Sequence, residues 1–140
     1  MVNALDRAFA NLIVSLKEIA LSVNAPAEQI VRSAAVIEQT FGGLTTNLWD
    51  DPFEWTLPET LSTPQLIVAY LSEVDAVRKR AFSSIAGDDE LSRYVPVPSG
   101  EPTRLIELLL ATLVEASDYR GRAIATLATT KGAKEESQEA

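Results

Sequence analysis

Apolar residues recur at spacings of three and four along most of the chain, which is the period of a helix with one buried face. Four stretches carry such a stripe: residues 5–23, 30–44, 67–85 and about 105–127. Strand-like alternation is almost absent. The pattern predicts an all-α fold of four helices, the last one running from about Pro102 to Thr130.

Residues that break helices separate these stripes. Asn24 and Pro26 suit the end of the first helix and the start of the second, so this turn is short and predicts antiparallel neighbours. The pair Gly42-Gly43 predicts the end of the second helix. Ser62 or Thr63 then caps a third helix. A charged tail over residues 131–140 is expected to fray, which leaves one domain over residues 1–130.

Residues 45–62 form a long irregular stretch that predicts a crossover between the second and third helices. Both tryptophans, Trp49 and Trp55, lie in it together with Phe53. With Tyr94, these aromatic rings form either an apolar wall over a ligand pocket, a cap on the core or part of a dimer interface. The predicted architecture is an antiparallel four-helix bundle with this crossover.

Composition excludes several classes of function. The chain has no histidine and no cysteine, so disulfides, thiolate nucleophiles and conventional serine triads are excluded. It carries 12 basic and 20 acidic residues, and a net charge of −8 repels nucleic acid and anionic membranes. No apolar run is long enough to span a bilayer, and the N-terminus lacks the pattern of a signal peptide. A cytoplasmic protein is expected.

Two motifs resemble a known family. The segment Glu115-Ala116-Ser117-Asp118-Tyr119-Arg120-Gly121-Arg122 is similar to the pattern H-x-x-x-H-R-G-Q, with both histidines replaced. Residues 88–100, which include Val95-Pro96-Val97-Pro98, resemble a segment that precedes it. In this order the chain resembles the DinB-like superfamily of helical bundles, which includes YfiT-type metal-dependent hydrolases and thiol-dependent transferases. The resemblance covers roughly residues 5–128.

The resemblance implies where a metal would be bound. In the family, one histidine from the second helix and two from the last helix, at i and i+4, hold a divalent metal. The corresponding positions here are Ala34, Glu115 and Tyr119. Because alanine cannot ligate and the imidazoles are missing, we expect no metal centre of this kind and no cofactor.

The remaining polar residues allow two interpretations. Glu38 and Glu115 could approach each other at the mouth of the bundle and, with Tyr119 and Arg122, hold a hard cation or act as general acid and base. Alternatively, Glu115 pairs with Arg122 or Arg78, and Tyr119 fills the volume of the lost metal site. The candidate ligand pocket is formed by Glu38, Trp49, Trp55, Glu115 and Tyr119.

Three further features have structural interpretations. Gly121 is expected to allow close helix approach, and Arg120 to bind polar groups within the fold. The run Arg78-Lys79-Arg80 is expected to form a solvated face. The sequence therefore predicts a non-catalytic module that binds a small ligand or another protein, and the resemblance implies a homodimer. The alternative is a metal-independent or carboxylate-based enzyme related to the transferases and hydrolases of the family.

Overall fold

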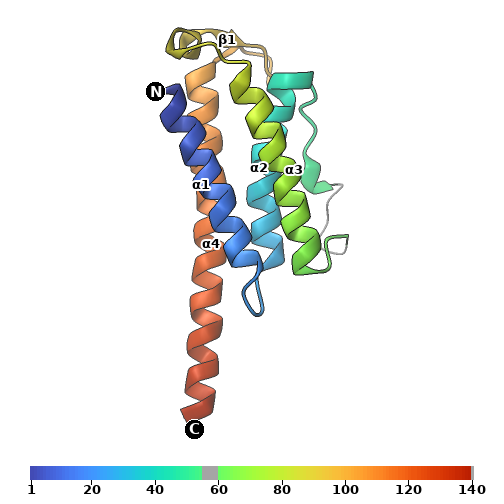
Figure 1. The fold of residues 1–140 in the computed structure, drawn as a ribbon, viewed down its shortest axis with the longest axis vertical. Helices are drawn as coiled ribbons and strands as arrows, with labels where there is room; N and C mark the ends of the chain where they lie inside the picture. Colours follow the sequence, from blue (N-terminus) through green and yellow to red (C-terminus); the bar gives the residue numbers. More distant parts are fainter. Residues whose placement is uncertain (55–59, 140) are drawn as a thin grey trace.

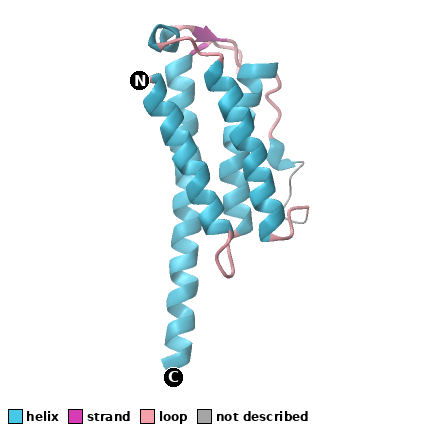
Figure 2. Ribbon diagram, viewed as in Figure 1, coloured by secondary structure: helices cyan, strands magenta, loops and turns pink. Residues whose placement is uncertain are grey.

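The computed structural model describes residues 1–54 and 60–139, and it is mostly helical (Figure 2). The prediction of an all-α chain with four main helices is confirmed. These helices are α1 (Val2–Ala20), α2 (Ala27–Thr46), α3 (Pro64–Ser83) and α4 (Leu105–Glu139). The short elements are the 3-10 helices η1 (Pro52–Glu54) and η2 (Asp88–Ser92) and the strands β1 (Tyr94–Val95) and β2 (Thr103–Arg104).

The direction of each helix explains the crossover. In Figure 1, α1 and α4 run downward, whereas α2 and α3 both run upward. Because α2 and α3 are parallel, residues 47–63 must connect the top of one to the bottom of the next. Each of these two helices also packs against a helix that runs the other way: α2 against α4, and α3 against α1. Although α1 and α2 are joined by a short turn, they contact each other less than they contact α3 and α4, so the predicted neighbour relation is weak.

Three phenylalanines from three helices form the centre of the core. Phe9 of α1 and Phe41 of α2 pack edge to face, with ring centroids 4.9 Å apart. Phe82 of α3 lies 5.4 Å from Phe41 and 6.0 Å from Phe9 by the same measure. Such aromatic contacts add about 0.5–1.5 kcal/mol each beyond burial of their area. The cluster fixes the relative positions of α1, α2 and α3.

A two-residue ribbon covers the end of the molecule where α4 begins. Tyr94 pairs with Arg104 and Val95 with Thr103 in antiparallel register. The backbone N–H of Leu105 donates to the carbonyl oxygen of Arg93 at 2.9 Å, which ties the start of α4 to this ribbon. The prolines on both sides of Val97 favour the extended path that leads from one strand to the other.

The glycine pair does not end α2. The helix continues through Gly42 and Gly43 to Thr46, and Asn47 closes it in the left-handed conformation, with φ of 57°. A Cβ on Gly43 would lie 2.3 Å from the indole ring of Trp49. The prediction that α2 ends at this pair was wrong. Gly43 is needed inside the helix because the indole ring of Trp49 packs against the helix backbone there.

Helix α4 is much longer than the other helices. It has 35 residues and continues to Glu139, whereas the sequence predicted an end near Thr130 and a fraying tail. Alanine, lysine, glutamate and glutamine predominate after Gly132, and these are strong helix formers. Gly121 has open space around it, with no atom within 4 Å of a built Cβ, so it does not serve a close approach within the chain.

Within residues 1–54 and 60–139, the helices are each too short or too polar to cross a membrane.

Candidate functional site

The three positions at which the resemblance implies metal ligands differ in their burial. Ala34 is completely buried on α2, where it faces the core. Glu115 is exposed on α4, and Tyr119 one turn further is half-buried. No group of three or more acidic side chains suited to a metal ion occurs in the described part of the chain. Glu38 and Glu115 belong to no such group, and their approach to each other stays a prediction.

The contact between α2 and α4 is instead closed by small residues and hydroxyl groups. We call Ser33, Ala34, Thr40, Thr112 and Ala116 the α2–α4 seam, and all five are buried. Ser33 Oγ donates to the carbonyl oxygen of Ala116 at 2.7 Å, and Thr40 Oγ1 and Thr112 Oγ1 lie 2.7 Å apart. Thr112 also donates to the carbonyl oxygen of Leu108, so Thr40 is the donor in the pair. The seam satisfies its own polar groups.

The charged residues of the α4 motif have partners that the sequence did not predict. Arg122 forms an ion pair with Asp118 at 2.8 Å, not with Glu115, and its guanidinium lies 5.2 Å from the ring centroid of Tyr119. The pair is exposed on both sides and contributes little to stability. Arg120 donates to Ser15 Oγ of α1 at 3.2 Å. These residues organise the surface of α4 and form no enclosed site.

The basic run on α3 is only partly a solvated face. Arg78 is 6% exposed and binds two carboxylates: Asp75, with Nε 2.8 Å from its Oδ1, and Asp6 of α1. Lys79 also reaches Asp75, at 3.5 Å. Burial alone would raise the pKa of Asp75, but the hydrogen bond and charge of Arg78, together with Lys79, hold this pKa below its usual value of 3.8. Arg78 is therefore a structural link between α1 and α3.

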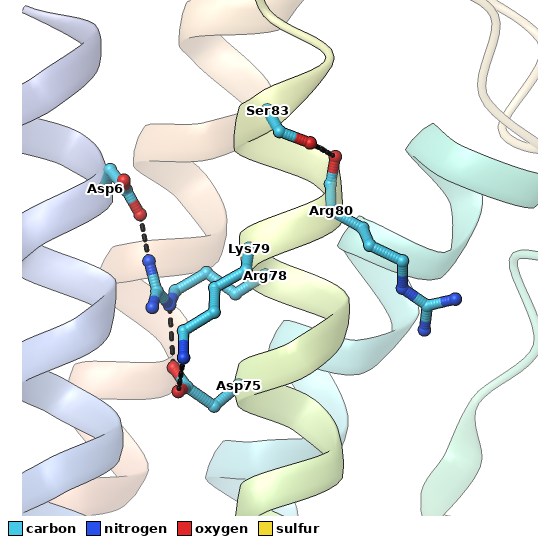
Figure 3. Close-up of polar contacts among 6 residues, drawn as sticks. All are labelled: Asp6, Asp75, Arg78, Lys79, Arg80 and Ser83. Carbon is cyan, nitrogen blue, oxygen red and sulfur yellow. Dashed lines mark hydrogen bonds and ion pairs between the residues drawn. The ribbon is translucent and has the colours of Figure 1, made fainter.

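Arg80 has a different environment from Arg78, although only one residue separates them. Figure 3 shows Arg78 directed toward α1 and Arg80 directed to the opposite side of α3. Two residues correspond to about 200° of helix rotation, which places the two side chains on different faces. Arg80 is exposed and makes no ion pair with the described residues. Its guanidinium is available to a bound anion.

The face of α3 that carries Arg80 borders a cleft of about 610 Å³. This volume lies within the range of about 300–1,000 Å³ that is typical of small-molecule sites. The cleft lies between α2, α3 and the first part of the crossover, and we call it the α2–α3 cleft. Its lining residues are Glu38, Gly42, Thr45, Thr46, Leu48, Asp50, Pro52, Val77 and Arg80.

The lining of the α2–α3 cleft combines both charges with apolar surface. Glu38 is half-buried, and its carboxylate accepts a hydrogen bond of 2.5 Å from the hydroxyl of Tyr70, which holds it in place. Asp50 contributes a second carboxylate from the crossover, whereas Arg80 contributes the positive charge from α3. Val77 supplies part of the apolar wall. A ligand with a cationic group, an anionic group and an aliphatic body would match this lining.

The crossover is attached to α2 on one side of this cleft. The side-chain amide of Gln39 donates to the carbonyl oxygen of Trp49 at 2.9 Å, and the Trp49 indole N–H donates to Asn47 Oδ1 at 3.1 Å. Trp49 itself packs on Gly43 and does not line the cleft. This location fits the interpretation of Trp49 as a core cap. Trp55, the other predicted pocket tryptophan, lies outside the described residues.

Of the predicted pocket residues that the structure describes, only Glu38 lines the α2–α3 cleft. The other eight lining residues were not predicted, and they include Asp50, Val77 and Arg80. One signal was present for Arg80. Val74, Arg78 and Ala81 follow the buried period of α3, so a residue two positions after Arg78 is expected on another face of the helix. The sequence predicts the crossover, but no signal in it indicates that the first part of the crossover lines a cleft between α2 and α3.

Comparison of the chain with protein-family models, with curated proteins and with solved structures finds no significant match.

Proposed function

We propose that this chain is a non-catalytic helical bundle that binds a small molecule in the α2–α3 cleft. The observation that carries the proposal is the lining of that cleft, where Glu38 and Arg80 supply opposite charges together with apolar residues such as Val77 and Leu48. The ligand class that fits is a small zwitterion with an aliphatic body. Its cationic group would bind Glu38 and Asp50, and its anionic group would bind Arg80.

The class of bundle is part of the same proposal. A DinB-like bundle without the three-histidine centre is supported by the order of the helices, the crossover between α2 and α3 and the ribbon before α4. It is further supported by the residues at positions 34, 115 and 119, which cannot form an imidazole site. We include in the proposal a cytoplasmic location, which rests on the sequence, and a homodimer, which rests on the resemblance to the DinB-like superfamily.

The enzymatic alternative has weaker support. It requires Glu38, Glu115, Tyr119 and Arg122 to act together on a substrate. Only Glu38 lines the α2–α3 cleft, whereas Glu115 and Arg122 are exposed on α4 and Arg122 pairs with Asp118. General acid–base chemistry needs groups within hydrogen-bond reach of one substrate, which this arrangement does not provide.

Two matched variants test the binding proposal. A set of size-matched amino acids, amines, carboxylates and neutral amides is titrated into the full chain by calorimetry. Arg80→Gln and Lys79→Gln remove the same charge from neighbouring positions, but only Arg80 lines the cleft. We expect zwitterionic members to bind best and Arg80→Gln alone to weaken them at least about tenfold, since a charge-assisted contact contributes about 1.5–3 kcal/mol. Equal weakening by both variants, or no binding by any member, would refute the proposal.

A further inference from the structure

One face of α4 carries no charge over six turns. The residues on it are spaced by three and four, so they lie on one side of the helix. Acidic and basic side chains of α4, such as Glu107, Glu115 and Asp118, lie at other positions around it. We call this face the α4 stripe, and it consists of Ile106, Leu110, Leu113, Val114, Ser117, Gly121, Ile124 and Ala128.

Large apolar residues of the α4 stripe are open to solvent. Leu110 is 46% exposed, Val114 is 69% exposed and Ile124 is 42% exposed. Single exposed apolar residues are ordinary, but a contiguous series along one helix face is typical of an interaction surface. In a chain with a net charge of −8, a face this long without any acidic residue is a marked departure from the average surface.

The stripe reaches the end of the part of α4 that the other helices support, where Leu127 still packs against the core. Arg120 contacts Ser15 of α1, and Ala116 contacts Ser33 of α2. Since α1 ends at Ala20, the other helices reach along α4 only to about residue 125 at 1.5 Å per residue. Figure 1 shows the remainder of α4 extending alone below the molecule. A single helix of about this length is marginal in water and gains stability by packing against a partner.

We propose that a second copy of this chain binds along the α4 stripe in antiparallel orientation. A twofold axis at the level of Tyr119 brings residues together whose numbers sum to 238. Leu110 then faces Ala128 of the other copy, and Val114 faces Ile124. A large side chain meets a smaller one in the first pair, and the axis makes the interface self-complementary, as a symmetric dimer requires.

The centre of this arrangement allows close approach of the two helices. Ser117 of one copy faces Gly121 of the other, and both residues are small. The open space around Gly121 within one chain is thus explained by contact with the second chain. Ala128, at the lower end of the stripe, would pack against the supported part of the other α4.

The stripe supplies part of the area that a stable dimer needs, because Ile106, Leu113 and Ser117 are half-buried within the chain. Residues 106–128 span about 33 Å, and half the circumference of a helix about 11 Å wide gives roughly 570 Å² per chain. Stable interfaces bury about 800 Å² per partner, and the edge of α1 beside α4 would add to the estimate. Because the stripe is free of charge, two chains of net charge −8 can meet there without opposing carboxylates.

The experiment uses the full chain and two matched variants. Val114→Glu places a charge in the stripe, whereas Ala111→Glu places the same charge at an exposed position on another side of α4. Sedimentation velocity over a range of concentrations is expected to show a dimer for the natural chain and for Ala111→Glu. Val114→Glu is expected to dissociate at least about tenfold more readily, since burying a charge without a partner is costly. Circular dichroism checks that each variant is folded.

Cross-linking tests the orientation, since the chain has no cysteine of its own. A mixture of Val114→Cys and Ile124→Cys chains, oxidised with copper phenanthroline, is expected to form a disulfide between the two species. Val114→Cys alone is expected to cross-link poorly, whereas efficient cross-linking of that single variant would refute the antiparallel register.

The outcomes separate this inference from the proposals on which it builds. It gives the proposed homodimer its interface, so a natural chain that is monomeric at all concentrations refutes both the interface and the homodimer. A dimer that Val114→Glu leaves intact refutes the interface alone. Calorimetric binding of zwitterions by Val114→Glu is expected to match that of the natural chain, because none of the described residues that line the α2–α3 cleft belongs to α4. The ligand proposal is therefore tested independently.

Discussion

Arg78 and Arg80 lie two residues apart on α3 and have opposite roles. Arg78 is buried against α1, where two carboxylates neutralise it, whereas Arg80 is exposed on the α2–α3 cleft without an ion-pair partner among the described residues. The comparison shows that two arginines on different faces of one helix can differ in role: one stabilises the fold, and the other is available to a ligand. A basic run in a sequence can therefore contain both kinds of residue.

Helix α2 shows the same contrast on its two sides. Toward α4 it presents the small residues and hydroxyls of the α2–α4 seam, which are buried and satisfy one another. Toward α3, Glu38 and Thr46 border an open cleft. The side on which the family resemblance implies a metal site is closed, and the side next to the crossover is open.

The largest expected effect comes from removing the buried arginine. Arg78→Ala leaves Asp6 and Asp75 without their common partner, and we expect a loss of about 3 kcal/mol in the free energy of unfolding. This is the low end for a broken buried pair, because both carboxylates are partly exposed. Urea denaturation measures it. Lys79→Ala is the control and should change stability by less than about 0.5 kcal/mol; similar losses for both variants would contradict the contrast within the basic run.

A smaller effect is expected in the α2–α4 seam. Thr112→Val keeps the shape of the side chain but leaves the hydroxyl of Thr40 buried without an acceptor, which costs about 1–2 kcal/mol. The double variant Thr40→Val, Thr112→Val removes both hydroxyls and should recover most of that loss. Urea denaturation of the three variants gives the double-mutant cycle. Additive losses would show that the two hydroxyls are not coupled.

The ion cluster around Arg78 also predicts a dependence on acid. Because the pKa of Asp75 is lowered in the folded chain, its stabilising contribution is complete above the usual value of 3.8 and is lost as the pH falls through the folded value. Unfolding by urea at several pH values below about 4 should therefore show a flatter profile for Asp75→Asn than for the natural chain. In an Arg78→Ala background only Lys79 opposes the effect of burial on the pKa of Asp75, so Asp75→Asn should no longer flatten the profile. If Asp75→Asn still flattens it, the lowered pKa is due to a group other than Arg78.

The smallest effect on stability is expected at Arg80. Arg80→Ala removes an exposed side chain without an ion-pair partner in the described part of the chain, so the free energy of unfolding should change by less than about 0.5 kcal/mol. Thermal unfolding with and without a bound zwitterion measures both properties of this residue. A loss as large as that of Arg78→Ala would show that Arg80 is structural and would remove the main support for the cleft as a binding site.

The helices were predictable because their stabilising contacts follow a local period. Residues such as Leu5, Phe9 and Leu16 are buried as the stripe predicts, and the Thr63 hydroxyl accepts from the N–H of Leu66 at the start of α3. The exceptions depend on contacts between distant residues. Gly43 is required by the indole of Trp49, and this contact has no local signature.

The candidate site was less predictable for the same reason. Burial of Arg78 could have been inferred from its position four residues after Val74 and three after Asp75, but the neighbouring charges favoured a solvated face. The resemblance implied that Glu115 faces α2, whereas the next residue, Ala116, is the one that contacts this helix. On a helix one residue corresponds to about 100° of rotation. A shift of one residue in the predicted inward position therefore hardly affects the predicted fold, but it changes which side chains form a site.

Chemical-shift mapping by nuclear magnetic resonance tests the central claim most directly. The natural chain, labelled with ¹⁵N, is titrated with the zwitterion that binds best in calorimetry, and the amide shifts are followed. We predict that the largest changes fall on Gly42, Thr45, Thr46, Val77 and Arg80, which line the α2–α3 cleft. Changes centred on Ala34, Glu115 and Tyr119 would contradict this account and return the site to the α2–α4 side.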